Sequence, residues 1–138
     1  RVLEVTPRFD TTGEKQEKML LAFTAAAASG DKDEVLRLLA PDVVALSDGG
    51  GLVTAARIPL EGAARVAQVF THIARRTAER GGMQLLAVNG QPALVRLAGD
   101  DGDMIFTVRL NQRGQICWLY TLRNPQKLAA VKTAHQAL

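Results

Sequence analysis

Few residues of this chain are of the types that carry out chemistry, and they form no familiar catalytic set. Neither His72 nor His135 has a second histidine at helical spacing, so no metal site is predicted. Ser47 has no glycine two residues before it and no identifiable base, unlike the nucleophile of a serine hydrolase. The single Cys117 excludes an internal disulfide, and we expect it to be a buried structural thiol.

Acid–base chemistry in a pocket is the enzymatic alternative that the sequence leaves open, because an apolar pocket can keep a carboxyl group protonated. The candidate groups are Asp48, Asp103, Arg109 and Tyr120. Asp103 follows two aspartates and a glycine, which indicates an exposed turn. The pattern places no pair of these groups within hydrogen-bond reach, as general acid–base catalysis requires. We therefore expect no catalytic residue, no metal and no cofactor.

Three consecutive glycines, Gly49, Gly50 and Gly51, form the most unusual motif of the chain. They match neither the dinucleotide-binding nor the P-loop pattern, and the preceding Asp48 would repel a phosphate. One explanation is a turn that needs positive φ at one or two positions. The other is a bare surface that another protein's backbone can approach closely. We favour the second, because a turn does not need three glycines.

Composition is that of an ordinary globular domain. The chain has 138 residues, of which 47% are hydrophobic and 22% charged, and its net charge is +3. It has no large basic cluster, so direct binding to nucleic acid is not expected. No apolar run approaches the length of a membrane-spanning helix, which makes the cytoplasm the default location. Because residue 1 is Arg, we expect an excised piece or a processed product.

Capping signals and an apolar stripe predict helices in the first half. Thr11 with Glu14, and Asp31 with Glu34, have the spacing of capping boxes that would open helices over residues 15–30 and 32–40. A third helix is predicted before Gly81, with an apolar face made of Val66, Val69, Phe70 and Ile73.

Alternating and apolar runs predict strands over residues 43–46, 52–57, 83–88, 92–98, 104–110 and 116–122. In the fifth of these, Phe106 and Val108 share one face, whereas Ile105, Thr107 and Arg109 share the other. In the last, one face would hold Ile116, Trp118, Tyr120 and Leu122. A final helix would begin at Asn124 and Pro125.

This order of elements predicts an α+β fold, in which a strongly curved, mostly antiparallel sheet wraps around a long helix. Such a cone leaves a pocket between the sheet and the helices, a common place for a ligand. The residues that we expect to line it are Phe70, Phe106, Trp118 and Tyr120.

Three blocks carry a family resemblance: "LLAPDVVALSDGGGLVTAARIPLEGAARVAQVF" at residues 38–70, "VNGQPALV" at 88–95 and "LRNPQKLA" at 122–129. Together they resemble the SnoaL-like extension at the carboxyl end of one group of extracytoplasmic-function sigma factors. The resemblance implies the nuclear-transport-factor-2-like cone. The opening "TPRFD" resembles the segment that joins this extension to the DNA-binding regions. We therefore expect a linker over residues 1–10 and the domain over residues 11–138.

The resemblance implies a regulatory domain that contacts the sigma regions responsible for binding RNA polymerase and promoter DNA. Carried over to this chain, the partner-binding residues are Asp48, Gly49, Gly50, Gly51, Asn124, Pro125, Lys127 and Leu128. The chain departs from the family pattern at Leu52, where a basic residue is usual, and at Gln126, where aspartate is usual. The alternatives are a stand-alone small-molecule binder or isomerase-like enzyme, and a dimerisation module that pairs through the open face of its sheet.

Overall fold

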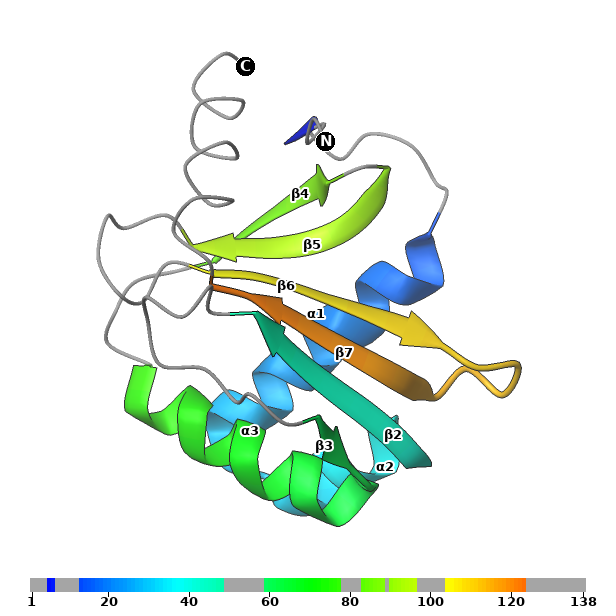
Figure 1. Cartoon of the computed structure of the whole chain (residues 1–138), viewed down its shortest axis with the longest axis vertical. Coiled ribbons are helices and arrows are strands. Elements are labelled where there is room, and N and C mark those ends of the chain that lie inside the picture. Colours follow the sequence, from blue (N-terminus) through cyan, green and yellow to red (C-terminus); the bar gives the residue numbers. More distant parts are fainter. Residues whose placement is uncertain are drawn as a thin grey trace.

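The computed structural model describes residues 5–6, 13–48, 59–77, 83–88, 90–96 and 104–123 (Figure 1). The helices are α1 (Glu14–Ser29), α2 (Lys32–Leu38) and α3 (Ala63–Thr77). The strands are β1 (Val5–Thr6), β2 (Leu39–Asp48), β3 (Leu60–Glu61), β4 (Gln84–Val88), β5 (Gln91–Arg96), β6 (Met104–Leu110) and β7 (Ile116–Leu122). The three glycines, the strand predicted at 52–57 and the helix predicted from Asn124 lie outside the described residues.

One seven-stranded sheet in the order β1-β4-β5-β6-β7-β2-β3 forms the body of the molecule. Its pairs are antiparallel except for β2 and β7, which run parallel. The sheet curves, with α1 crossing behind it and α3 lying along its β2 and β3 side (Figure 1). The predicted α+β class with a mostly antiparallel curved sheet is therefore confirmed. The two residues of β1 fall within the predicted linker, and the domain boundaries stay a prediction.

Helices α1 and α2 meet at a connection that the sequence predicts well. Gly30 adopts a left-handed conformation (φ 79°), and its amide donates to the carbonyls of the last turn of α1. Asp31 then caps α2, because its carboxylate accepts a hydrogen bond of 3.1 Å from the Glu34 amide. Such a cap stabilises a helix by about 1 kcal/mol.

The start of α1 differs from the prediction. Glu14 is its first residue rather than the third of a capping box, and Gly13 occupies the N-cap with φ 81° and no side-chain cap. A β-carbon on Gly13 would lie 3.2 Å from Cδ of Pro92, so the close approach to β5 also favours glycine. The expected cap Thr11 lies outside the described residues.

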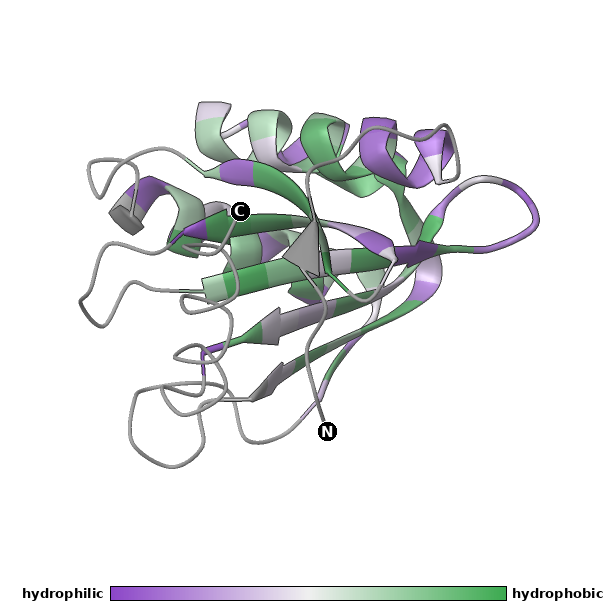
Figure 2. Ribbon diagram, turned by 90° about the horizontal axis from the view of Figure 1, so that it is seen from above, coloured by the Kyte–Doolittle hydropathy of each residue, from purple (hydrophilic) through white to green (hydrophobic). Residues whose placement is uncertain are grey.

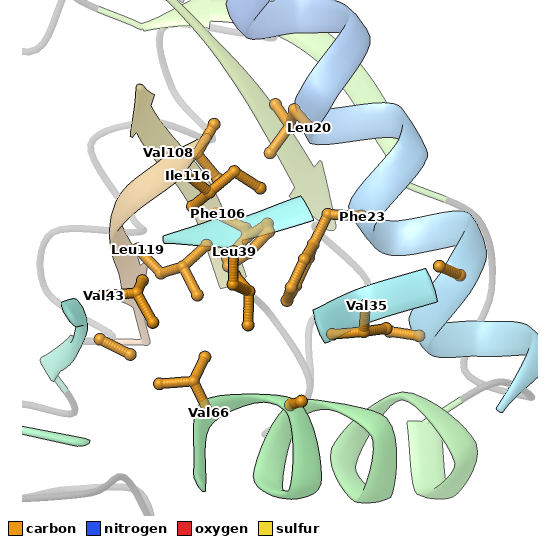
Figure 3. Close-up of a cluster of buried hydrophobic side chains, with 14 of the residues drawn as sticks. Leu20, Phe23, Val35, Leu39, Val43, Val66, Phe106, Val108, Ile116 and Leu119 are labelled. Carbon is orange, nitrogen blue, oxygen red and sulfur yellow. The ribbon is translucent and has the colours of Figure 1, made fainter. Parts of the chain in front are cut away.

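The core between the helices and the sheet, here the helix-side core, holds side chains from both layers (Figure 3). Its centre is Phe23 of α1, which is 1% exposed. The Phe23 ring lies 5.6 Å from that of Phe70 and 5.7 Å from that of Phe106, and the last two rings lie 5.7 Å apart. Figure 2 shows that hydrophobic residues occur on both the helices and the strands, so each layer contributes side chains to the helix-side core. Three aromatic rings thus join α1, α3 and β6.

The buried face of α3 is rotated from the predicted one. Val66 and Ala67 are fully buried and Phe70 packs against the helix-side core, but Ile73 is 43% exposed. The face turned inward comprises Val66, Ala67, Phe70, Thr71 and Ala74. The spacing of the large apolar residues alone therefore does not identify the buried face of α3, which includes two alanines and a threonine.

Strand β7 also differs from the prediction, because a bulge interrupts its alternation. The register with β6 shifts between Arg109, which pairs with Trp118, and Leu110, which pairs with Ile116. Ile116 therefore joins the helix-side core, whereas Trp118 lies on the opposite face. The residue left between these pairs is Cys117, which is half-buried rather than buried and whose thiol contacts the Arg109 carbonyl at 3.5 Å.

Candidate partner-binding end of the sheet

The expected partner-binding residues form two blocks, the glycine block (Asp48–Gly51) and the Asn-Pro block (Asn124–Leu128). Parallel pairing of β2 with β7 brings together the strand ends that lead into these two blocks. Asp48, the last residue of β2, pairs with Leu122, the last residue of β7. The glycines follow Asp48 directly, and Asn124 comes two residues after Leu122. Paired strands lie about 4.8 Å apart. The two blocks, 76 positions apart from Asp48 to Asn124 (124 − 48), therefore start from neighbouring strands at one end of the sheet.

Other strands also terminate at this end. Ile105, the second residue of β6, pairs with Leu122, and Met104 pairs with Arg96, the last residue of β5. Arg96 lies two positions after Leu94 of the helix-side core, on the same face, and it is only 7% exposed. A cationic side chain is therefore buried at the end of the sheet from which both blocks depart.

The four residues predicted to line a pocket do not come together. Phe70 and Phe106 contact each other in the helix-side core, on the face of the sheet covered by the helices. Tyr120 pairs with Thr107, the neighbour of Phe106, so Tyr120 points to the opposite face with Trp118. The register of β7 with β6 and the alternation along β6 thus put the sheet between Phe70 and Phe106 on one side and Trp118 and Tyr120 on the other.

The opposite face carries a stacked aromatic pair. The rings of Trp118 and Tyr120 lie 5.4 Å apart with an angle of 7° between their planes. The Cζ atom of Arg109 lies 5.2 Å from the centre of the Trp118 ring, within range of a cation–π interaction. Tyr120 also packs against a second group of buried residues on this face, here the outer cluster, consisting of Leu86, Ala93, Val95, Ile105 and Leu122.

The candidate acid–base groups are only partly placed by the structure. Arg109 and Tyr120 share the face of the sheet opposite the helices. Asp48 is the last residue of β2, directly before the three glycines. Asp103 lies outside the described residues. Within the described ranges, no three His, Cys, Asp or Glu side chains gather as metal ligands would. His72 is exposed on α3, and His135 falls outside these ranges.

Sequence reasoning missed three buried polar residues, Thr71, Arg96 and Thr121. The Thr71 hydroxyl is buried on α3 and makes no hydrogen bond within the described part of the chain. Arg96 interrupts the apolar run "PALVRLA". A charged residue inside such a run could have indicated a buried cation, because charged residues are seldom buried without a partner. For Thr71 the signal was weak, because threonine is common on half-exposed helix faces.

Comparison with known proteins relates the chain to one sigma factor. No family model matches it. It is 32% identical over 111 residues to the ECF RNA polymerase sigma factor SigJ of Mycobacterium tuberculosis, an alignment that covers 75% of this chain and 36% of SigJ. The crystal structure of SigJ superimposes with a TM-score of 0.71 at 28% identity, over 87% of this chain and 46% of that one. The resemblance to the SnoaL-like domain of an extracytoplasmic-function sigma factor is confirmed, and the chain spans about a third of SigJ.

More distant structures show the fold alone. An uncharacterised protein with a cystatin-like fold from Silicibacter pomeroyi gives a TM-score of 0.52 at 19% identity, over 91% of this chain and 88% of its own. A Mycobacterium tuberculosis protein solved in complex with estradiol-17beta-hemisuccinate gives 0.51 at 16% identity, over 81% and 95%. None of the helices within the described residues is long and apolar enough to cross a membrane.

Proposed function

We propose that this domain regulates an extracytoplasmic-function sigma factor by contacting the sigma regions that bind RNA polymerase and promoter DNA. The contact surface is the end of the sheet where β2 and β7 stop, with the glycine block and the Asn-Pro block as its two halves. The domain acts in the cytoplasm through protein contacts, without catalysis and without binding nucleic acid itself. The relationship to SigJ supports the sigma-factor setting.

The pairing of Asp48 with Leu122 is the observation that carries this proposal. Both blocks therefore begin at paired strand ends, and this part of the sheet is buried, since Leu122 is 5% exposed. A single partner segment can therefore bridge them. Three residues without side chains beside a carboxylate offer that partner a close backbone approach and one hydrogen-bond acceptor.

A double-mutant cycle tests whether the two blocks act as one surface. The variants are Asp48→Ala in the first block, Lys127→Ala in the second, and the combination. Binding of each to the purified sigma regions is measured by isothermal titration calorimetry. Because the blocks start from adjacent strands, we expect a coupling free energy of about 0.5–3 kcal/mol between the two substitutions.

Asp42→Ala is the matched control, because Asp42 is an exposed aspartate near the opposite end of the same strand. It should leave binding unchanged, and all variants should melt like the unaltered domain. Additive losses would show two separate contacts. Unchanged binding in the well-folded double variant would refute the proposed surface.

Ligand binding inside the domain is a second candidate, and the buried Thr71 hydroxyl favours it. A polar group without a partner in an apolar interior is costly, and a ligand that accepts its hydrogen bond would relieve that cost. The ligand would be a small, largely apolar molecule with a carbonyl or hydroxyl group. Thermal-shift screening of such molecules tests this function: a hit should stabilise the unaltered domain but not Thr71→Val, and a hit indifferent to that change would place the site elsewhere.

A further inference from the structure

Helix α3 carries basic side chains and no acidic ones. Its sequence, AARVAQVFTHIARRT, contains three arginines and one histidine, and no acidic residue occurs anywhere in residues 62–78. Spacings of three, four and three residues separate Arg65, Gln68, His72 and Arg75. Side chains at these spacings lie on one side of an α-helix, and all four are exposed. These four residues, here the α3 stripe, lie on a helix at the outside of the molecule beside β2 and β3 (Figure 1).

The charge of the α3 stripe is not balanced within the described part of the chain, where no carboxylate forms an ion pair with it. The other two helices differ in this respect. Helix α1 exposes Glu14 beside Lys15 and Lys18, and in α2 the side chain of Arg37 lies 2.7 Å from that of Glu34. Opposite charges therefore mix on α1 and α2, whereas α3 presents one sign to a partner of the other sign.

An apolar edge runs beside the α3 stripe. Val69 and Ile73 come four and eight positions after Arg65, which places them between the stripe and the buried face of the helix. Val69 is half-buried and belongs to neither buried cluster. Ile73 is 43% exposed, one of two exposed large hydrophobic side chains among the described residues. The outer side of α3 thus joins positive charge to aliphatic surface that a partner would remove from water.

This combination favours a protein partner over nucleic acid. Phosphate groups pair with arginine but gain nothing from Ile73. Arg65 and Arg75 are ten residues apart, about 15 Å along the helix axis, so only a few phosphates would be contacted. An α-helix laid antiparallel along α3 meets both features, because its residues have the same rise. Carboxylates three or four positions apart then face the α3 stripe, and aliphatic residues beside them face the apolar edge.

We propose that the outer side of α3 is a docking surface for an acidic amphipathic helix of a partner protein. Carboxylates of that helix form ion pairs with Arg65 and Arg75, and its aliphatic residues cover Val69 and Ile73. Charge complementarity and the adjoining apolar edge together select this occupant. The inference does not depend on the proposed contact through the glycine and Asn-Pro blocks, since α3 is a different element from β2 and β7.

Fluorescence anisotropy of a labelled helical peptide mixed with the 138-residue chain tests the proposal. The probe carries glutamates at the spacings of the α3 stripe, and leucines four and eight positions after the first glutamate. A second peptide with lysine at every glutamate position is the charge-reversed probe. The unaltered chain should bind the acidic peptide but not the lysine peptide, and its affinity should fall as the salt concentration rises.

Charge reversal on α3 gives the sharpest result. Arg65→Glu combined with Arg75→Glu should weaken binding of the acidic peptide at least about fivefold, because two attractions become repulsions. The same double variant should bind the lysine peptide. Ile73→Ser should weaken binding of the acidic peptide about threefold or more through lost apolar contact. Lys15→Glu combined with Lys18→Glu makes the same charge change on exposed positions of α1, and this matched control should leave binding unchanged.

Several outcomes would overturn the proposal. One is an unaltered chain that does not bind the acidic peptide up to high micromolar concentration. Another is binding that survives the charge reversal in a variant that melts normally, or survives Arg65→Gln with Arg75→Gln if the reversed variant does not fold. A chain that ignores the peptide but binds a mixed-sequence DNA duplex, or vesicles containing anionic lipid, would assign the α3 stripe to phosphate groups. Unchanged binding by Ile73→Ser would refute the role of the apolar edge.

Discussion

Replacing Phe23 by alanine tests the central packing of the domain. The side chain is 1% exposed and its ring contacts both Phe70 and Phe106. Removing a buried phenylalanine ring costs about 3–5 kcal/mol, from lost burial and the cavity left behind. Because whole domains are stable by only about 5–15 kcal/mol, this substitution should lower the melting temperature by roughly 10–15 °C. Phe23→Leu should cost about 1–2 kcal/mol, because it refills most of the volume but loses the ring contacts.

Urea denaturation followed by fluorescence of the single Trp118 measures these losses. Trp118 lies on the face of the sheet opposite Phe23, so its signal reports unfolding of the whole domain rather than repacking beside the substitution. Leu21→Ala is the control on the same helix, since Leu21 is 44% exposed and its loss should cost under about 0.5 kcal/mol. A loss below about 1 kcal/mol for Phe23→Ala, with an unchanged denaturant slope, would refute the proposed role of the aromatic cluster.

Three further substitutions probe local features. Asp31→Ala should cost about 1 kcal/mol by removing the cap of α2, and a thermal melt by circular dichroism that matches the unaltered domain would contradict this role. Gly30→Ala should cost about 1–2 kcal/mol in the same assay, because alanine is strained at φ 79°; since no heavy atom lies within 4 Å of the added carbon, any loss measures backbone strain rather than a clash. Thr71→Val should leave the free energy of unfolding unchanged or raise it, since it removes a buried hydroxyl without a partner; a loss above about 1 kcal/mol in urea would mean that the hydroxyl is hydrogen-bonded.

The local elements of this domain are largely encoded by nearby residues. The cap at Asp31 and the end of α1 at Gly30 depend on contacts within a few positions, so the sequence predicts both. The alternation of β6 likewise follows from strand geometry, and its two faces were predicted correctly. The order of these elements was sufficient to predict an α+β fold with a curved sheet.

Features that depend on neighbours distant in sequence were not predicted. The bulge opposite Arg109 moves Ile116 into the helix-side core, and nothing in the alternation of β7 itself indicates it. Ile73 was expected to be buried, yet it is 43% exposed and Ala67 is fully buried instead, because contacts with other elements decide which side of α3 turns inward. The assumption that Ile116, Trp118 and Tyr120 share one buried face also placed the four expected pocket residues together, whereas the structure puts the sheet between them.

The sequence alone determined α1, α2 and α3, most of the described strand positions and the two blocks, because each depends on short-range periodicity or on a contiguous motif. Only the tertiary structure decided that Asp48 ends beside Leu122, because a parallel register between β2 and β7 is set by packing across the whole sheet. It likewise decided that Glu61, Val44, Trp118 and Arg109 form one row. These four residues come from four strands, and hydrogen bonding between strands, rather than any local preference, brings them into line.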